Sequence, residues 1–129
     1  MRYLLDTRVW LWLQVSPTEI RSDALEALLD TRNELFLSAV SCWEIGVKYA
    51  AGKLSLPAPP AEYVPARLKQ SGTATLAMLP EHALLAARLP EHHRDPIDRL
   101  LVAQAVHEKL TLVTANPAFA AYDVQLLQT

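Results

Sequence analysis

The feature that most constrains the fold is the alternation of short apolar runs with longer stretches of helical spacing. Strand-like runs lie at residues 3–5, 34–37, 75–79, 110–113 and 124–127. A strand that is buried on both faces is continuously apolar, and strands separated by helices pair in parallel. We therefore predict an α/β fold with three layers, in which helices cover both faces of a mostly parallel sheet of four to five strands.

Capping residues and prolines mark the ends of the predicted helices. These helices span residues 7–13, 18–32, 39–51, 62–70, 80–88 and 96–109, with a short helical turn at 118–122. Thr18 and Asp95 are expected N-caps for two of them, Ser38 begins the helix at 39–51, and Pro96 stands at the favoured first position of its helix. Residues 53–60 contain three prolines and form an extended connection inside the domain.

The length and charge of the chain narrow the possible partners. Its 129 residues are predicted to form a single domain, residues 1–129. The formal net charge is −2, so any polyanion must be held locally, by a metal or a basic patch. A lone cysteine, Cys42, suits a reducing compartment, and the sequence contains neither a signal peptide nor a bilayer-spanning run. We expect a cytoplasmic protein that does not bind membranes.

Polar residues stand at equivalent places in this architecture. Asp6 follows the first strand, Glu44 lies early in the helix after the second, Asp98 lies in the first turn of the helix before the fourth, and Asn116 follows the fourth strand. Each carboxylate also has a simpler explanation, because Asp6 can cap a helix, Glu44 can pair with Lys48, and Asp98 can belong to a capping box. The carboxyl ends of parallel strands share one edge of a sheet, so we expect all four side chains to converge there.

Carboxylates held close together repel one another unless a cation neutralises them. Hard oxygen ligands suit Mg²⁺ or Mn²⁺ rather than Zn²⁺. Such an ion polarises a phosphate oxygen and lowers the pKa of water, so the pattern points to phosphoryl chemistry.

Four motifs in this order resemble the PIN domain and, within it, the VapC-like toxins of bacterial toxin–antitoxin pairs. They are Leu4-Leu5-Asp6-Thr7 with Val9-Trp10-Leu11, Ser41-Cys42-Trp43-Glu44-Ile45, the run from Arg94 to Ala105, and Leu112-Val113-Thr114-Ala115-Asn116. The resemblance covers essentially the whole chain. It implies a PIN-like fold and a metal-dependent ribonuclease that hydrolyses RNA phosphodiester bonds.

The resemblance also implies roles for individual residues. Asp6, Glu44 and Asp98 would be catalytic and would bind Mg²⁺ or Mn²⁺, Asn116 would be a further ligand, and Asp95, Thr7 and Thr114 would support them. The implied partners are an RNA substrate, a cognate antitoxin protein and a second copy of the chain in a homodimer. Plausible walls of an antitoxin groove are Trp10, Trp12, Leu25, Leu28 and Leu29.

Two departures from the family pattern bear on activity. Arg8 replaces the histidine that commonly follows Asp-Thr, and Asn116 replaces a fourth aspartate. Asn116 offers an oxygen but no charge, which favours one tightly bound ion. The alternative function is therefore a PIN-fold RNA- or protein-binding module with weak or no catalysis. Arg8 and Arg99 adjoin the carboxylates in sequence and could contact RNA phosphates.

Three other mechanisms fit the sequence less well. His92 and His93 could act as acid and base without a metal, although adjacent loop residues seldom face one pocket. A phosphoacceptor receiver needs a lysine after a late strand, and residues 113–117 contain none. A haloacid-dehalogenase-type phosphatase needs an acid two residues after Asp6, where Arg8 stands.

Overall fold

The sheet of this protein is parallel throughout. The structure is a computed structural model that describes residues 1–92 and 94–129. Within these residues five strands pair in the order β3-β2-β1-β4-β5, and every neighbouring pair is parallel. The strands are β1 Arg2–Leu5, β2 Glu34–Ser38, β3 Thr73–Leu76, β4 Thr111–Thr114 and β5 Leu126–Gln128. The predicted α/β class is confirmed.

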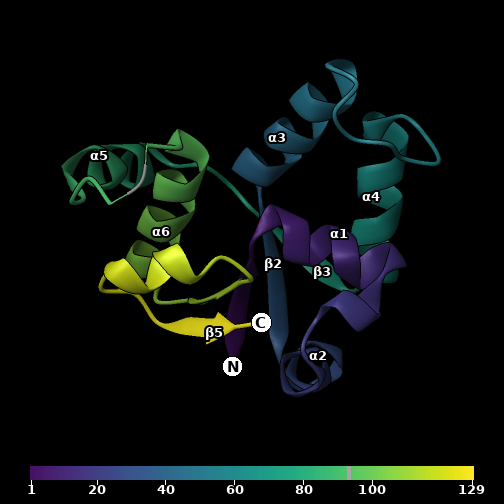
Figure 1. The fold of residues 1–129 in the computed structure, drawn as a ribbon, viewed down its shortest axis with the longest axis horizontal. Helices are drawn as coiled ribbons and strands as arrows, with labels where there is room; N and C mark the ends of the chain where they lie inside the picture. Colours follow the sequence, from purple (N-terminus) through teal and green to yellow (C-terminus); the bar gives the residue numbers. More distant parts are fainter. Residues whose placement is uncertain (93) are drawn as a thin grey trace.

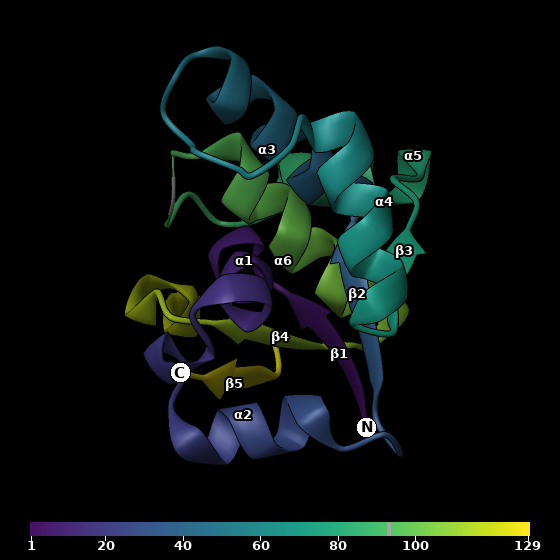
Figure 2. The ribbon, with the colours of Figure 1, turned by 90° about the vertical axis from the view of Figure 1, so that its right-hand side faces the viewer.

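Helices cover both faces of the sheet. The α-helices are α1 Thr7–Val15, α2 Ser22–Leu29, α3 Ala39–Ala50, α4 Pro60–Gln70, α5 Pro80–Arg88 and α6 Pro96–Glu108, and 3₁₀ turns form η1 Pro17–Glu19 and η2 Pro117–Ala121. Figure 1 shows α5 and α6 on one side of the strands and α1, α2 and α4 on the other, with α3 rising beyond the carboxyl end of β2. The view turned by 90° shows β1, β4 and β5 side by side between these layers (Figure 2).

Alternate residues of the central strands feed two hydrophobic cores. On β1, Tyr3 and Leu5 join the core that includes residues of α1, α2 and α4, whereas Leu4 joins the core around α6 and η2. Val113 and Leu112 of β4 divide between the cores in the same way. Because both faces of these strands are buried, no polar residue interrupts their apolar runs.

The predicted start of α3 at Ser38 and the predicted cap of α6 at Asp95 are observed. Ser38 Oγ accepts a hydrogen bond from the Val40 amide at 3.0 Å, and Asp95 Oδ1 accepts one from the Ile97 amide at 2.9 Å. Each bond satisfies one of the amides that the first turn of a helix leaves without an intrahelical partner. These caps fix where α3 and α6 begin, next to the carboxyl edge of the sheet.

Two predicted elements have the wrong boundaries. The helix predicted at 18–32 is divided, because Ile20 is extended and buried between η1 and α2, and the cap expected at Thr18 is wrong because Thr18 lies inside η1. The strand predicted at 75–79 is Thr73–Leu76, because Leu76 pairs with Ser38 and β2 ends there. Beyond that point a longer β3 would have no partner strand on this side.

The predicted groove walls are also partly wrong. Trp10 is fully buried and Leu28 is 4% exposed, so both belong to the core, whereas Leu29 is 64% exposed. None of the described helices combines the length and apolar character that crossing a lipid bilayer would require.

Candidate active site

A cavity of about 300 Å³ opens at the carboxyl edge of the sheet. It receives side chains from the start of α1, from α3, from the N-terminal end of α6 and from the segment after β4. The lining residues are Asp6, Thr7, Arg8, Leu11, Glu44, Ile45, Lys48, Lys53, Leu54, Asp95, Asp98, Ala115 and Asn116. The cavity thus brings together the three predicted catalytic carboxylates and Asn116, although as many as 110 positions separate them in sequence.

Asp6 is held at the end of β1 by the neighbouring strand. Its amide donates to the Val113 carbonyl at 2.9 Å, and its Oδ2 accepts from Thr114 Oγ1 at 2.8 Å. The same hydroxyl accepts from the Asn116 amide at 3.0 Å. Burial raises the pKa of Asp6, and the Thr114 hydrogen bond opposes that rise. The carboxylate is therefore oriented by Thr114, a partner that the bare helix-cap explanation does not provide.

Glu44 lies at the edge of the buried face of α3. At helical spacing Glu44 shares a face with Val40, Val47 and Ala51, and we expect an apolar stripe there. Only Val40 is buried, because Val47 is 46% exposed and Ala51 is exposed, so the expected stripe is wrong at two of its three apolar positions. The face that α3 buries carries Ile45 instead. Glu44 Oε2 lies 2.9 Å from Lys48 Nζ, so the ion pair that would explain Glu44 without a metal is present, and both residues line the cavity.

Asp98 is the most strongly perturbed carboxyl group in the cavity. Its pKa is raised to about 7, first by burial and then by the negative charges of Asp95, Asp6 and Glu44, while Lys48 acts in the opposite direction. All four acids line the same cavity, and charges in a solvated protein interact over a Debye length of about 8–10 Å. The four acids therefore form one electrostatic cluster.

Two predicted supporting groups have specific hydrogen bonds. Thr7 Oγ1 donates to Ser41 Oγ at 2.8 Å, and both residues are buried, so this bond ties the start of α1 to α3. Asn116 Oδ1 accepts from the Ala118 amide at 3.0 Å and caps η2. The Asn116 oxygen thus has one lone pair engaged and one remaining for a ligand.

The two arginines proposed for phosphate contact lie in different places. Arg8 lines the cavity, with its guanidinium carbon 5.8 Å from the centre of the Trp12 ring. Arg99 instead donates hydrogen bonds of 2.7–3.0 Å to three carbonyls at the end of α5, those of Ala86, Leu89 and Pro90. These three hydrogen bonds hold the Arg99 guanidinium at the junction of α5 and α6, so a phosphate-binding role for Arg99 is not supported.

A buried polar pair that the sequence analysis missed fixes the helices around the cavity. Ser38 Oγ donates to Gln104 Oε1 at 2.6 Å, and both side chains are fully buried. Gln104 also donates to the Ala77 carbonyl at 3.3 Å. The signal in the sequence is a glutamine inside the apolar run 101–105 of α6. The pair links the end of β2, where α3 begins, to the helix that carries Asp98.

The donor set of the cavity fits a hard divalent cation. Its carboxylate oxygens come from Asp6, Glu44, Asp95 and Asp98, and burial raises the pKa of Asp6 and Asp98. These carboxylates line an open cavity of about 300 Å³, which leaves room for water beside an ion. Mg²⁺ usually retains several waters and takes only one or two carboxylates, so an open set of this kind suits it.

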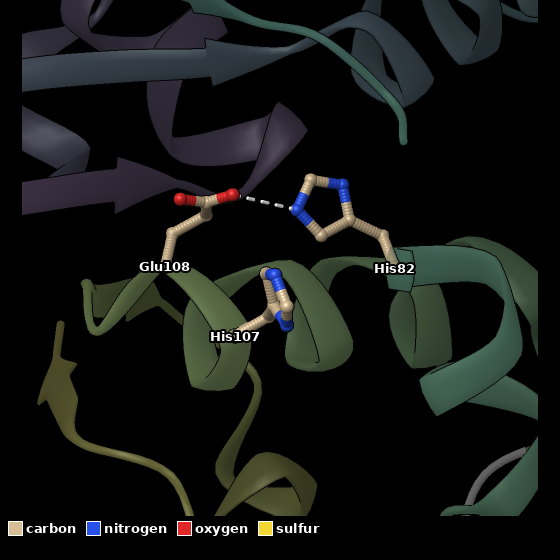
Figure 3. A group of neighbouring side chains, drawn as sticks. All are labelled: His82, His107 and Glu108. Atoms are coloured by element: carbon tan, nitrogen blue, oxygen red, sulfur yellow. Dashed lines mark hydrogen bonds and ion pairs between the residues drawn. The ribbon is translucent and has the colours of Figure 1, made fainter. Parts of the chain in front are cut away.

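A second group of potential ligands, His82, His107 and Glu108, lies outside this cavity at the ends of α5 and α6 (Figure 3). His82 is fully buried, and its Nδ1 accepts from the Leu79 amide at 3.0 Å. A neutral imidazole then carries its proton on Nε2, which lies 2.9 Å from Glu108 Oε1. With one nitrogen accepting and the other protonated, His82 has no free lone pair for a metal. The contacts of His82 with Glu108 and His107 therefore hold α5 against α6.

The metal-free alternative depends on His92 and His93, of which the structure describes only His92. The His92 ring packs edge-on against Tyr122, with 5.0 Å between ring centroids. His93 lies outside the described residues.

Comparison with known proteins agrees with this architecture. Residues 3–125 match the PIN domain. Ribonuclease VapC16 from Mycobacterium tuberculosis (strain ATCC 25618 / H37Rv) is 48% identical over 59 residues, which cover 46% of this chain and 40% of that protein. The aligned segment is thus less than half the length of this curated relative.

Solved structures share the fold across nearly the whole chain. VapBC2 from Rickettsia felis, bound to a DNA fragment from its promoter, aligns with a TM-score of 0.74 and 18% identity over 99% of this chain and 98% of that chain. DNA-bound VapBC from Salmonella typhimurium aligns with a TM-score of 0.71 and 17% identity over the same shares of the two chains. At these identities the likeness concerns the fold.

Proposed function

The chain belongs to the PIN domain family, and from this premise we propose that it is a metal-dependent endoribonuclease that acts as the toxin of a toxin–antitoxin pair. The observation that carries the proposal is the single cavity lined by Asp6, Glu44 and Asp98, from three separate elements. The name of the Mycobacterium tuberculosis relative, a ribonuclease, supports the same activity.

The metal would be Mg²⁺ or Mn²⁺. Asp6, Glu44 and Asp98 would hold it, and Asn116 would add its amide oxygen. When bound, such an ion polarises a phosphate oxygen and lowers the pKa of water at the site. The uncharged Asn116 favours one tightly bound ion over two.

The side chains around the cavity would prepare the reaction. Thr114 orients the Asp6 carboxylate through its 2.8 Å hydrogen bond, and Thr7 holds the start of α1 against α3. Arg8 would bind a phosphate oxygen of the RNA at the rim. Glu44 would act as a ligand or would orient the attacking water. Water attacks the phosphorus, the bond to the 3′ oxygen breaks and that oxygen takes up a proton, so the products carry a 5′-phosphate and a 3′-hydroxyl.

The proposed partner is a cognate antitoxin. The Rickettsia felis and Salmonella typhimurium structures with this fold are complexes named VapBC. By analogy we propose that this chain binds an antitoxin in the cytoplasm and forms a homodimer.

An RNA cleavage assay tests the proposed function. We expect the wild-type protein to cleave RNA with Mn²⁺ and to stop when EDTA is added. Asp6→Asn should abolish cleavage, because it removes one ligand charge while Asn can still accept from Thr114. Asp123→Asn, at an exposed aspartate outside the cavity, is the matched control and should cleave like wild type.

The alternative function, an RNA- or protein-binding module with little catalysis, predicts a different result. It rests on Asn116, which supplies no charge at the position where the family pattern has an aspartate. In that case RNA would bind without being cut at any Mn²⁺ concentration, and Asp6→Asn would change neither result. Cleavage that persists in EDTA would contradict the proposed metal dependence.

A further inference from the structure

The acidic cavity already contains basic side chains. Four carboxylates line it, from Asp6, Glu44, Asp95 and Asp98, together with Arg8, Lys48 and Lys53. Lys48 has the shortest ion pair among these basic groups, with its Nζ 2.9 Å from Glu44 Oε2. The proposed metal ligand Glu44 is therefore already paired with a cation of the protein itself.

The two partners of this ion pair differ in their surroundings. The Glu44 side chain is 15% exposed and anchored in the wall of α3, whereas the Lys48 side chain is 52% exposed. They are separated by four residues on one helix, so their side chains meet without any backbone movement. The long, flexible lysine stem lets the ammonium leave Glu44 while the carboxylate stays in place.

The charge of Lys48 also acts beyond Glu44. Among the groups that perturb Asp98, Lys48 is the cation that opposes the three neighbouring acids. One ammonium therefore partly neutralises two of the three proposed metal ligands.

We propose that Lys48 is the resident cation of this cavity: its ammonium occupies Glu44 in the metal-free protein and competes with the divalent ion for that carboxylate. Lys48 is thus a positioning residue for Glu44. The inference rests on the proposed function, which it deepens by stating what the ion must displace. A half-exposed ion pair is weak, so the competition is modest and an ion at sufficient concentration wins.

Calorimetric titration with Mn²⁺ alone tests this competition without relying on activity. Lys48→Met keeps the aliphatic stem and removes the charge, and we expect it to bind Mn²⁺ about two- to fivefold more tightly than wild type. Lys48→Arg retains a cation and should bind like wild type. Lys53→Met removes a different charge from the same cavity and should change the affinity less than Lys48→Met does.

A double-mutant cycle separates competition for Glu44 from a general charge effect. In a Glu44→Gln background only the effect of Lys48 on Asp98 remains, so Lys48→Met should give a clearly smaller gain in Mn²⁺ affinity than it gives in the wild-type background. Unchanged or weaker binding by Lys48→Met would overturn the inference, and so would an equal gain in Lys53→Met or in the Glu44→Gln background.

If wild type and every variant fail to bind Mn²⁺, the proposed metal site is refuted together with the competition. Binding by wild type with no gain in Lys48→Met refutes the competition alone.

Discussion

Replacing Asp98 with asparagine should change how the stability of the metal-free protein depends on pH. Burial and the neighbouring acids raise the pKa of this carboxyl from 3.8 to about 7 in the folded protein. Between these values the folded state holds a proton that the unfolded state has released, so stability falls as pH rises through this window. The contribution of Asp98 to the free energy of unfolding is largest below about pH 4 and is lost above about pH 7. Asparagine resembles the protonated acid and should remove this dependence.

The size of the effect follows from the shift. About three pKa units correspond to an upper bound of about 4 kcal/mol, at 1.36 kcal/mol per unit. Asp98 is only half-buried, and solvent screening reduces this to about 1–2 kcal/mol. Asp98→Asn should therefore exceed wild type by a smaller amount at pH 5, where part of the stability is already lost, and by the full amount at pH 8. A smaller decline should remain, because burial also raises the pKa of Asp6.

Urea denaturation in EDTA at pH 5, 6, 7 and 8 measures this difference, and Asp123→Asn serves as the exposed control. With Mn²⁺ present, wild type should recover stability at pH 8, because the ion binds the deprotonated carboxylate. Parallel pH profiles of wild type and Asp98→Asn in EDTA would refute the reasoning, because the loss of stability with rising pH would then not come from Asp98.

Three further predictions follow from individual hydrogen bonds. Asn116→Asp should strengthen Mn²⁺ binding, because it adds a charge and can still accept from Ala118; calorimetry that shows no gain would mean that this side chain does not reach the ion. Glu108→Ala should cost about 1–3 kcal/mol in urea denaturation, because the buried His82 Nε2–H loses its acceptor, while Glu108→Gln keeps an acceptor and should cost less than about 1 kcal/mol. Equal losses would contradict the neutral tautomer. Arg99→Ala should lower stability by about 1–2 kcal/mol and leave Mn²⁺-dependent cleavage in place; a stable variant without cleavage would restore its phosphate-binding role.

The features predicted correctly from the sequence depend on residues close together in the chain. The continuous apolar run of β1 requires burial on both faces, which already indicates a parallel sheet between helices. Ser38 and Asp95 lie next to the amides that they cap. The order of strands and helices also predicts that Asp6, Glu44 and Asp98 share one edge of the sheet, where the cavity lies.

Long-range contacts decided what the sequence left open. Thr114, the partner of Asp6, is 108 residues away, and the end of β3 depends on where β2 stops. Arg99 adjoins Asp98 in sequence, yet its guanidinium binds carbonyls at the end of α5. Helical spacing and capping depend on interactions between residues within one or two helical turns of each other. The direction of a long side chain depends instead on which hydrogen-bond acceptors the tertiary structure brings near it. The sequence thus determined the class of fold and the edge that carries the acids, and only tertiary packing decided which groups orient and neutralise them.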